Sequence, residues 1–170
     1  DEGQTRWDKQ SVLTADDAAI GAQFGHSVSV DKDTIIVGAH GMDDAGIDSG
    51  AAYLFTRTSD VWNQQSKIAG QDIATGDLFG YSVAIDGDLA IVGAHGANQE
   101  AGAAFIFVRD NAIWRQQAKL EANDSTPGDA FGYSVAVHQQ TVIVGAPKND
   151  VVGTDAGAAY VFVQQGEKWI

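Results

Sequence analysis

The chain of 170 residues has no cysteine, only two prolines and no long apolar run. The lack of cysteine excludes disulfides and thiol chemistry. It counts against a eukaryotic extracellular domain, in which disulfides are common, and is compatible with a bacterial one. Two prolines are too few for a proline-rich linker. No apolar stretch approaches the roughly 20 residues that a transmembrane helix needs, so we expect no insertion into a membrane.

Basic residues are also scarce, because 10 Lys and Arg stand against 23 Asp and Glu and give a formal net charge of −13. Nucleic acid is not expected as a partner, since phosphate backbones are bound by clustered Lys and Arg. An anionic membrane surface is disfavoured for the same reason. The acidic balance favours solubility and the attraction of cations.

The sequence is rich in internal repetition. Its four tryptophans, Trp7, Trp62, Trp114 and Trp169, stand 55, 52 and 55 residues apart. A Phe-Gly pair, a Gly-Ala pair and a Gly-Ala-Ala-aromatic segment recur in the same register. A motif repeated in register is a building unit more often than a catalytic motif. We therefore interpret residues 1–170 as a single module whose repeats run approximately over 7–61, 62–113 and 114–168.

Each repeat predicts four β-strands, which in the second repeat cover 62–69, 79–85, 89–94 and 103–108. The alternation over 79–85 places Phe79, Tyr81, Val83 and Ile85 on one face and small residues on the other. The Asp-Gly pair that follows predicts a tight hairpin. The third and fourth strands are apolar on both faces and must be covered on both sides.

These features predict an all-β fold, a β-propeller made of three four-stranded blades that cover one another. A β-solenoid is the rival architecture, although its repeat is usually shorter. A β-sandwich rarely repeats its sequence so faithfully.

The repeated pairs also resemble FG-GAP repeats, which build the propeller of integrin α subunits and occur in many bacterial surface and secreted proteins. The third repeat matches both halves of that motif with Phe131-Gly132 and Gly145-Ala146-Pro147, whereas His40 and His95 replace the proline in the first two. The resemblance implies an integrin-type propeller that is secreted or at a cell surface, in a bacterium. It also implies a role in protein interaction, adhesion or assembly.

The number of strands poses the question of how a ring would close. The first predicted strand, at Trp7, has no blade before it, and the last blade lacks its final strand. Three blades also fall short of the four to eight that are typical of propellers. We expect one of two arrangements. In the first, a second copy completes a six-bladed ring, as a homodimer in which the N-terminal strand of one chain closes the last blade of its neighbour. In the second, the rest of a longer chain completes the ring.

Calcium is the cofactor that the resemblance suggests, bound in an Asp-rich loop between the Phe-Gly and Gly-Ala-Pro strands. That connection is too short here to supply the roughly six to eight oxygens that calcium needs. The candidate Ca²⁺ ligands are instead in the loops that follow Gly-Ala, at Asp43, Asp44, Asp48, Asp150 and Asp155. The alternative is that these side chains cap turns.

Histidines and tryptophans supply the candidate ligand-binding residues. His40 and His95 occupy equivalent positions and would form a transition-metal set with Asp43, while His26 replaces the tyrosine of the other two repeats. Trp62 and Trp114 would stack on a sugar and make the chain a lectin-like propeller with a glycan partner. The same tryptophans would equally pack between blades.

A catalytic set is not expected, so we predict that the protein is not an enzyme. Ser27, Ser82 and Ser134 occupy one strand position in all three repeats, which favours packing or backbone hydrogen bonding over nucleophilic chemistry. The sequence has no nucleophile elbow, no phosphate-binding loop and no unmatched acid pair.

Overall fold

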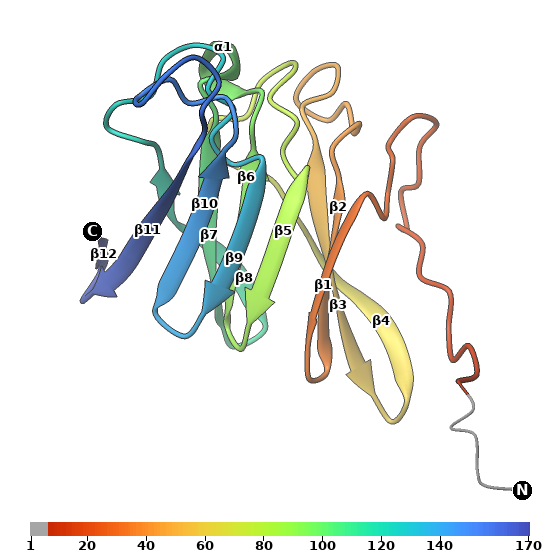
Figure 1. The fold of residues 1–170 in the computed structure, drawn as a ribbon. Helices are drawn as coiled ribbons and strands as arrows, with labels where there is room; N and C mark the ends of the chain where they lie inside the picture. The colour runs from red at the N-terminus through yellow and green to blue at the C-terminus, as the bar shows by residue number, and fades with distance from the viewer. Residues whose placement is uncertain (1–6) are drawn as a thin grey trace, which may run out of the picture.

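The computed structural model describes residues 7–170 and consists almost wholly of β-strands (Figure 1). In chain order these are β1 (Ser27–Asp31), β2 (Thr34–Ala39), β3 (Ala51–Thr58), β4 (Val61–Ile68), β5 (Ser82–Asp86), β6 (Leu89–Ala94), β7 (Ala103–Asp110), β8 (Ile113–Leu120), β9 (Ser134–His138), β10 (Thr141–Ala146), β11 (Ala158–Gln165) and β12 (Lys168–Trp169). The described helical structure is the single turn α1 (Ala97–Glu100), which is neither long nor apolar enough to cross a membrane.

The strands form three four-stranded antiparallel sheets, β1-β2-β3-β4, β5-β6-β7-β8 and β9-β10-β11-β12, here called blades 1, 2 and 3. The expected all-β architecture of three four-stranded blades is therefore confirmed. The first strands, β1, β5 and β9, lie side by side, and the sheets extend outward from them (Figure 1). Each Trp-bearing strand, β4, β8 or β12, is the outermost of its blade.

The blades have two different ends. Tight turns link β1 to β2, β5 to β6 and β9 to β10 at one of them, the hairpin end, where the register leaves two residues outside each strand pair. Gly87 in the second of these turns has φ of 61°, which glycine adopts without strain. The predicted Asp-Gly hairpin is therefore present. The opposite end, the loop end, carries the longer connections 40–50, 95–102 and 147–157.

The interiors lie between blades. Blade 1 contributes Ile36 and Leu54 to the first inter-blade core, and blade 2 contributes Phe79, Val83 and Val92. Blade 2 packs on blade 3 in the same way, through a second cluster of buried residues. The expectation that neighbouring blades cover each other's apolar faces is met at both interfaces. A tryptophan also donates a hydrogen bond from one blade to the blade before it. Trp114 Nε1 of blade 2 donates to Gln65 Oε1 of blade 1 over 3.1 Å.

The serines bridge the same interfaces. Ser27 Oγ donates to the carbonyl oxygen of Gly80 over 2.8 Å, and Ser82 Oγ donates to that of Gly132 over 2.7 Å. The interpretation of the repeated serine as a residue that bonds backbone is confirmed at these two positions.

Three strand predictions are wrong in detail. The last blade, which was expected to lack its final strand, has the short strand β12 paired with β11. The Phe-Gly strand of blade 2 begins at Ser82 instead of Phe79, because Gly80 has φ of 88° and turns the chain. Phe79 still enters the core, but Tyr81 does not share its face. The predicted strand at Trp7 is absent, since the described residues before β1 are not strand, and Trp7 is 91% exposed. A strand needs a partner edge, and this segment contacts β4 only through side chains, with no backbone ladder to a described strand.

Candidate functional site

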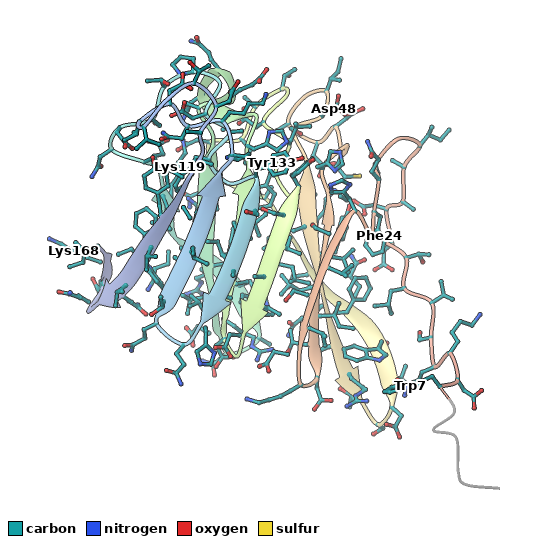
Figure 2. All side chains as sticks on the ribbon, in the orientation of Figure 1. Trp7, Phe24, Asp48, Lys119, Tyr133 and Lys168 are labelled. Carbon is teal, nitrogen blue, oxygen red and sulfur yellow. The ribbon has the colours of Figure 1, made fainter. Side chains whose placement is uncertain are left out.

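Five ring side chains gather where the three blades converge at the loop end; we call them the inner ring row. His26, Tyr81 and Tyr133 each directly precede the first strand of their blade, and His40 and His95 directly follow the second strand. Ring centroids are 4.3 Å apart for His26 and His40, 4.2 Å for Tyr81 and His95, and 5.0 Å for Tyr81 and Tyr133. Figure 2 labels Tyr133 at the start of β9. The row therefore links all three blades.

His40 is the most enclosed member of the inner ring row. It is 7% exposed, and its Nδ1 has no hydrogen-bond partner in the described part of the chain. Burial holds the pKa of His40 below its ordinary value; a charged His26 would lower it further, whereas Asp48 opposes the shift. Burial likewise lowers the pKa of His95. Both imidazoles are thus held in the neutral form.

These lowered pKa values predict a loss of stability in mild acid. The unfolded chain takes up protons near the ordinary histidine pKa of about 6.5, while the folded chain resists them. The histidines therefore make their whole contribution to the free energy of unfolding above that pH. This contribution declines as the pH falls toward the lower pKa values of the folded state. Carboxyls with lowered pKa, such as Asp17 and Asp129, lose their contribution only below their ordinary value of 3.8. The two effects occupy separate pH windows.

Urea denaturation between pH 7.5 and pH 5 measures this effect. His40→Phe keeps a ring at the site and is expected to flatten the decline. His138→Phe is the control, because the side chain of His138 is 82% exposed. Equal declines in both variants would show that His40 is not a source of the acid sensitivity.

The acidic residues predicted as metal ligands lie at the loop end but stabilise their own loops. Asp43 Oδ1 accepts a hydrogen bond from the backbone N–H of Asp48 over 2.8 Å, and Asp150 Oδ1 accepts one from that of Asp155 over 2.7 Å. Asp44 forms an ion pair with Lys67. Within residues 7–170 no three His, Asp or Glu side chains gather as a metal site would require. The geometry fits turn capping better than calcium binding.

The two candidate sugar-binding tryptophans differ in exposure. Trp114 is 7% exposed, with the guanidinium of Arg109 5.3 Å from its ring centroid. Trp62 is partly exposed, and Arg57 lies 5.4 Å from its ring centroid. Each arginine is the cross-strand partner of its tryptophan within one blade and covers a ring face that a sugar would use. Packing between blades is supported by the place of Trp114 in the first inter-blade core and by its hydrogen bond to Gln65 of blade 1. Glycan binding through these residues stays a prediction.

The structure brings His40 and His95 into one row, as their equivalent positions suggested, but Tyr81 lies between them. Asp43 is not part of a metal set with them. Sequence reasoning missed Tyr81 and Tyr133 as members. The signal was present in the ring side chain that follows every Phe-Gly pair. Its significance depends on how blades converge, which a single repeat does not reveal.

Blades of this kind define a β-propeller-like protein, and the yeast protein Sqt1 from Saccharomyces cerevisiae shows the same arrangement. Its solved structure superposes with a TM-score of 0.55 at 11% identity, covering 86% of this chain and 33% of Sqt1. The likeness concerns the fold alone. The FG-GAP repeat model matches residues 7–55, 62–107 and 114–162, so the chain belongs to the FG-GAP repeat family.

Integrin alpha-2 of Mus musculus is a curated relative. It is 36% identical over a stretch that covers 52% of this chain and 9% of the integrin. The repeats are therefore integrin-like. The chain spans less than a tenth of that relative's length, so its role has to be argued from its own surface.

Proposed function

We propose that this chain is a non-enzymatic protein-binding module that works in adhesion or assembly at a bacterial cell surface or in the secreted space. Its binding surface is the loop end of the blades. The observation that carries the proposal is the exposure of apolar residues at loop tips: Ile47, Val151 and Val152 are 69%, 63% and 81% exposed. Exposed apolar side chains rimmed by polar residues are typical of protein-binding surfaces.

The chemistry around these tips suggests the kind of partner. Asp43, Asp48, Asp150 and Asp155 are exposed in the same loops, and the whole chain carries a net charge of −13. Charge complementarity steers association and selects partners. A partner with basic residues around an apolar centre would match this surface. Tyr133, 44% exposed in the inner ring row, adds a ring of the kind enriched at interfaces.

Peptides displayed on phage and selected on the wild-type chain test the proposal. We expect the enriched sequences to be basic and apolar, and their affinity to fall about tenfold or more on Ile47→Ser/Val152→Ser, since a lost apolar anchor is worth 1.4 kcal/mol or more. The control, Val61→Ser/Ile113→Ser, removes side chains of similar exposure from outer strands. Peptides that bind both variants equally would contradict a loop-end binding surface.

A further inference from the structure

Blade 3 has one apolar face that no blade in the described chain covers. Ile143 and Val161 on this face are 41% and 58% exposed. Their counterparts in blade 2, Ile91 and Ile106, are both 0% exposed, because blade 3 packs on them. The uncovered face of blade 3 thus carries the same kind of apolar residues as the face of blade 2 on which blade 3 packs.

Blade 1 has the complementary face. Val28 and Val30 are 67% and 63% exposed, whereas their counterparts in blade 2, Val83 and Ile85, are 8% and 6% exposed against blade 1. Val28 and Val30 line an apolar groove with Leu13, Phe24, Ile35 and Val37. The groove lies on the side of blade 1 away from blade 2, where Figure 2 labels Phe24. This face of blade 1 thus carries the same kind of apolar residues as the face of blade 2 that packs on blade 1.

The polar contacts of the two internal interfaces can be repeated between these faces. Ser134 stands where Ser27 and Ser82 donate to the carbonyl oxygens of Gly80 and Gly132. The equivalent acceptor on blade 1 is the carbonyl of Gly25. One contact differs, because His138 replaces Asp86, which accepts a hydrogen bond from the backbone N–H of Gln139. A neutral imidazole nitrogen can accept the same kind of bond.

The segment before β1 occupies the place of an outer strand from a preceding blade. Trp62 Nε1 donates to Gln10 Oε1 over 3.4 Å, as Trp114 does to Gln65 and Trp169 to Gln117. These glutamines each stand three residues after a tryptophan. The N-terminal segment is therefore placed to border a further blade next to blade 1, outside the described residues.

The open edge of blade 3 matches that segment. In blades 1 and 2 the third strand pairs with the fourth along almost its whole length. In blade 3 only Lys168–Ile170 lie along β11: Gln164 pairs with Trp169, Gln165 pairs with Lys168, and Val163 and Ile170 exchange two backbone hydrogen bonds. Much of β11 thus offers a free edge in the described chain.

We propose that the uncovered face of blade 3 receives blade 1 of a second copy of this chain, and that two such contacts close a six-bladed ring. Residues 9–13 of each copy then lie along the free edge of β11 in the other, beyond the part that Lys168–Ile170 already occupy. Both faces are apolar, and the free edge of β11 is of the kind that soluble proteins normally cover. The ring also involves part of the loop end, because the loops of blades 1 and 2 already bond the next blade there, as the backbone N–H of Gly76 does to the carbonyl oxygen of Ile47. The two proposals still fail separately, because the ring is tested at Val28 and Val161 and the binding function at Ile47 and Val152.

Light scattering coupled to size exclusion tests the ring. We expect the wild-type chain at micromolar concentration to have twice the 17.8 kDa mass of one copy. Val161→Asp and Val28→Asp are each expected to give monomers, whereas Ile113→Asp, equally exposed on an outer strand, remains a dimer. A wild-type monomer overturns the proposal. A mass larger than that of two copies contradicts a ring closed by two chains.

A cysteine pair tests the register, because the chain has no cysteine of its own. The pairings of Leu54 with Ser66 and of Ile106 with Ala118 place Ser11 of one copy opposite Val161 of the other. Ser11→Cys/Val161→Cys is expected to give a disulfide-linked dimer after mild oxidation, as a directly paired position allows. A mixture of the single variants Ser11→Cys and Val161→Cys should give only the cross-linked heterodimer. The double variant Ser11→Cys/Ile113→Cys should give no cross-linked dimer. Equal cross-linking of both pairs overturns the proposed register.

Discussion

Phe79→Ala is expected to lower the free energy of unfolding by about 3–5 kcal/mol, the range found for truncating a buried phenylalanine. Phe79 is 0% exposed between blades 1 and 2. Its ring packs edge to face on Phe105 at 5.4 Å and on Phe107 at 6.0 Å. Alanine would leave a cavity that the surrounding strands cannot close. Denaturation followed by tryptophan fluorescence measures the loss.

Phe24→Ala is the matched control for this prediction. Phe24 makes the same two ring contacts in blade 1, at 5.4 Å with Tyr53 and 6.0 Å with Phe55, but it remains partly exposed. In the Val161→Asp background, which is designed to keep the chain monomeric, truncation of Phe24 should cost less than half as much as truncation of Phe79. Equal losses would mean that blade 1 is covered in the monomer, contrary to the uncovered groove described above.

The repeat register made most of the fold predictable. Landmarks that recur every 52 or 55 residues required three similar units, and strands apolar on both faces required neighbours on both sides. The alternation of residues could not show where each first strand begins, because it does not reveal that Gly80 has a positive φ. Nor could it show that the segment at Trp7, with its strand-like sequence, contacts β4 through side chains without a backbone ladder.

The candidate site was less predictable, because it forms between repeats. The equivalent positions of His40 and His95 point to a shared place in the blades, but their contacts depend on Tyr81, which precedes β5 in the same blade as His95. The sequence places acidic residues in the loops that follow Gly-Ala but does not distinguish capping from cation binding. The structure shows that Asp43 and Asp150 accept hydrogen bonds from backbone N–H groups of their own loops. A composition rich in carboxylates is thus compatible with either capping or cation binding.

Gly93→Ala is the second substitution expected to have a large effect. A Cβ at Gly93 would overlap the carbonyl oxygen of Gly132 in blade 3, and backbone cannot move aside as a side chain can. We expect a loss of about 1–3 kcal/mol, as for other overpacked sites. The measurement is the urea-induced unfolding of the variant, compared with wild type in the same monomeric background.

Gly145→Ala makes the comparison decisive, because Gly145 is the counterpart of Gly93 in blade 3. Within the described chain a Cβ there would meet only the side chain and backbone of Ser134, whose hydroxyl can rotate away at a cost of about 1 kcal/mol or less. The monomer should therefore tolerate Gly145→Ala. In the proposed ring the new methyl would meet the carbonyl of Gly25 from the second copy, so the same substitution should dissociate the dimer. A variant as unstable as Gly93→Ala would show that the face of blade 3 is already covered within one chain.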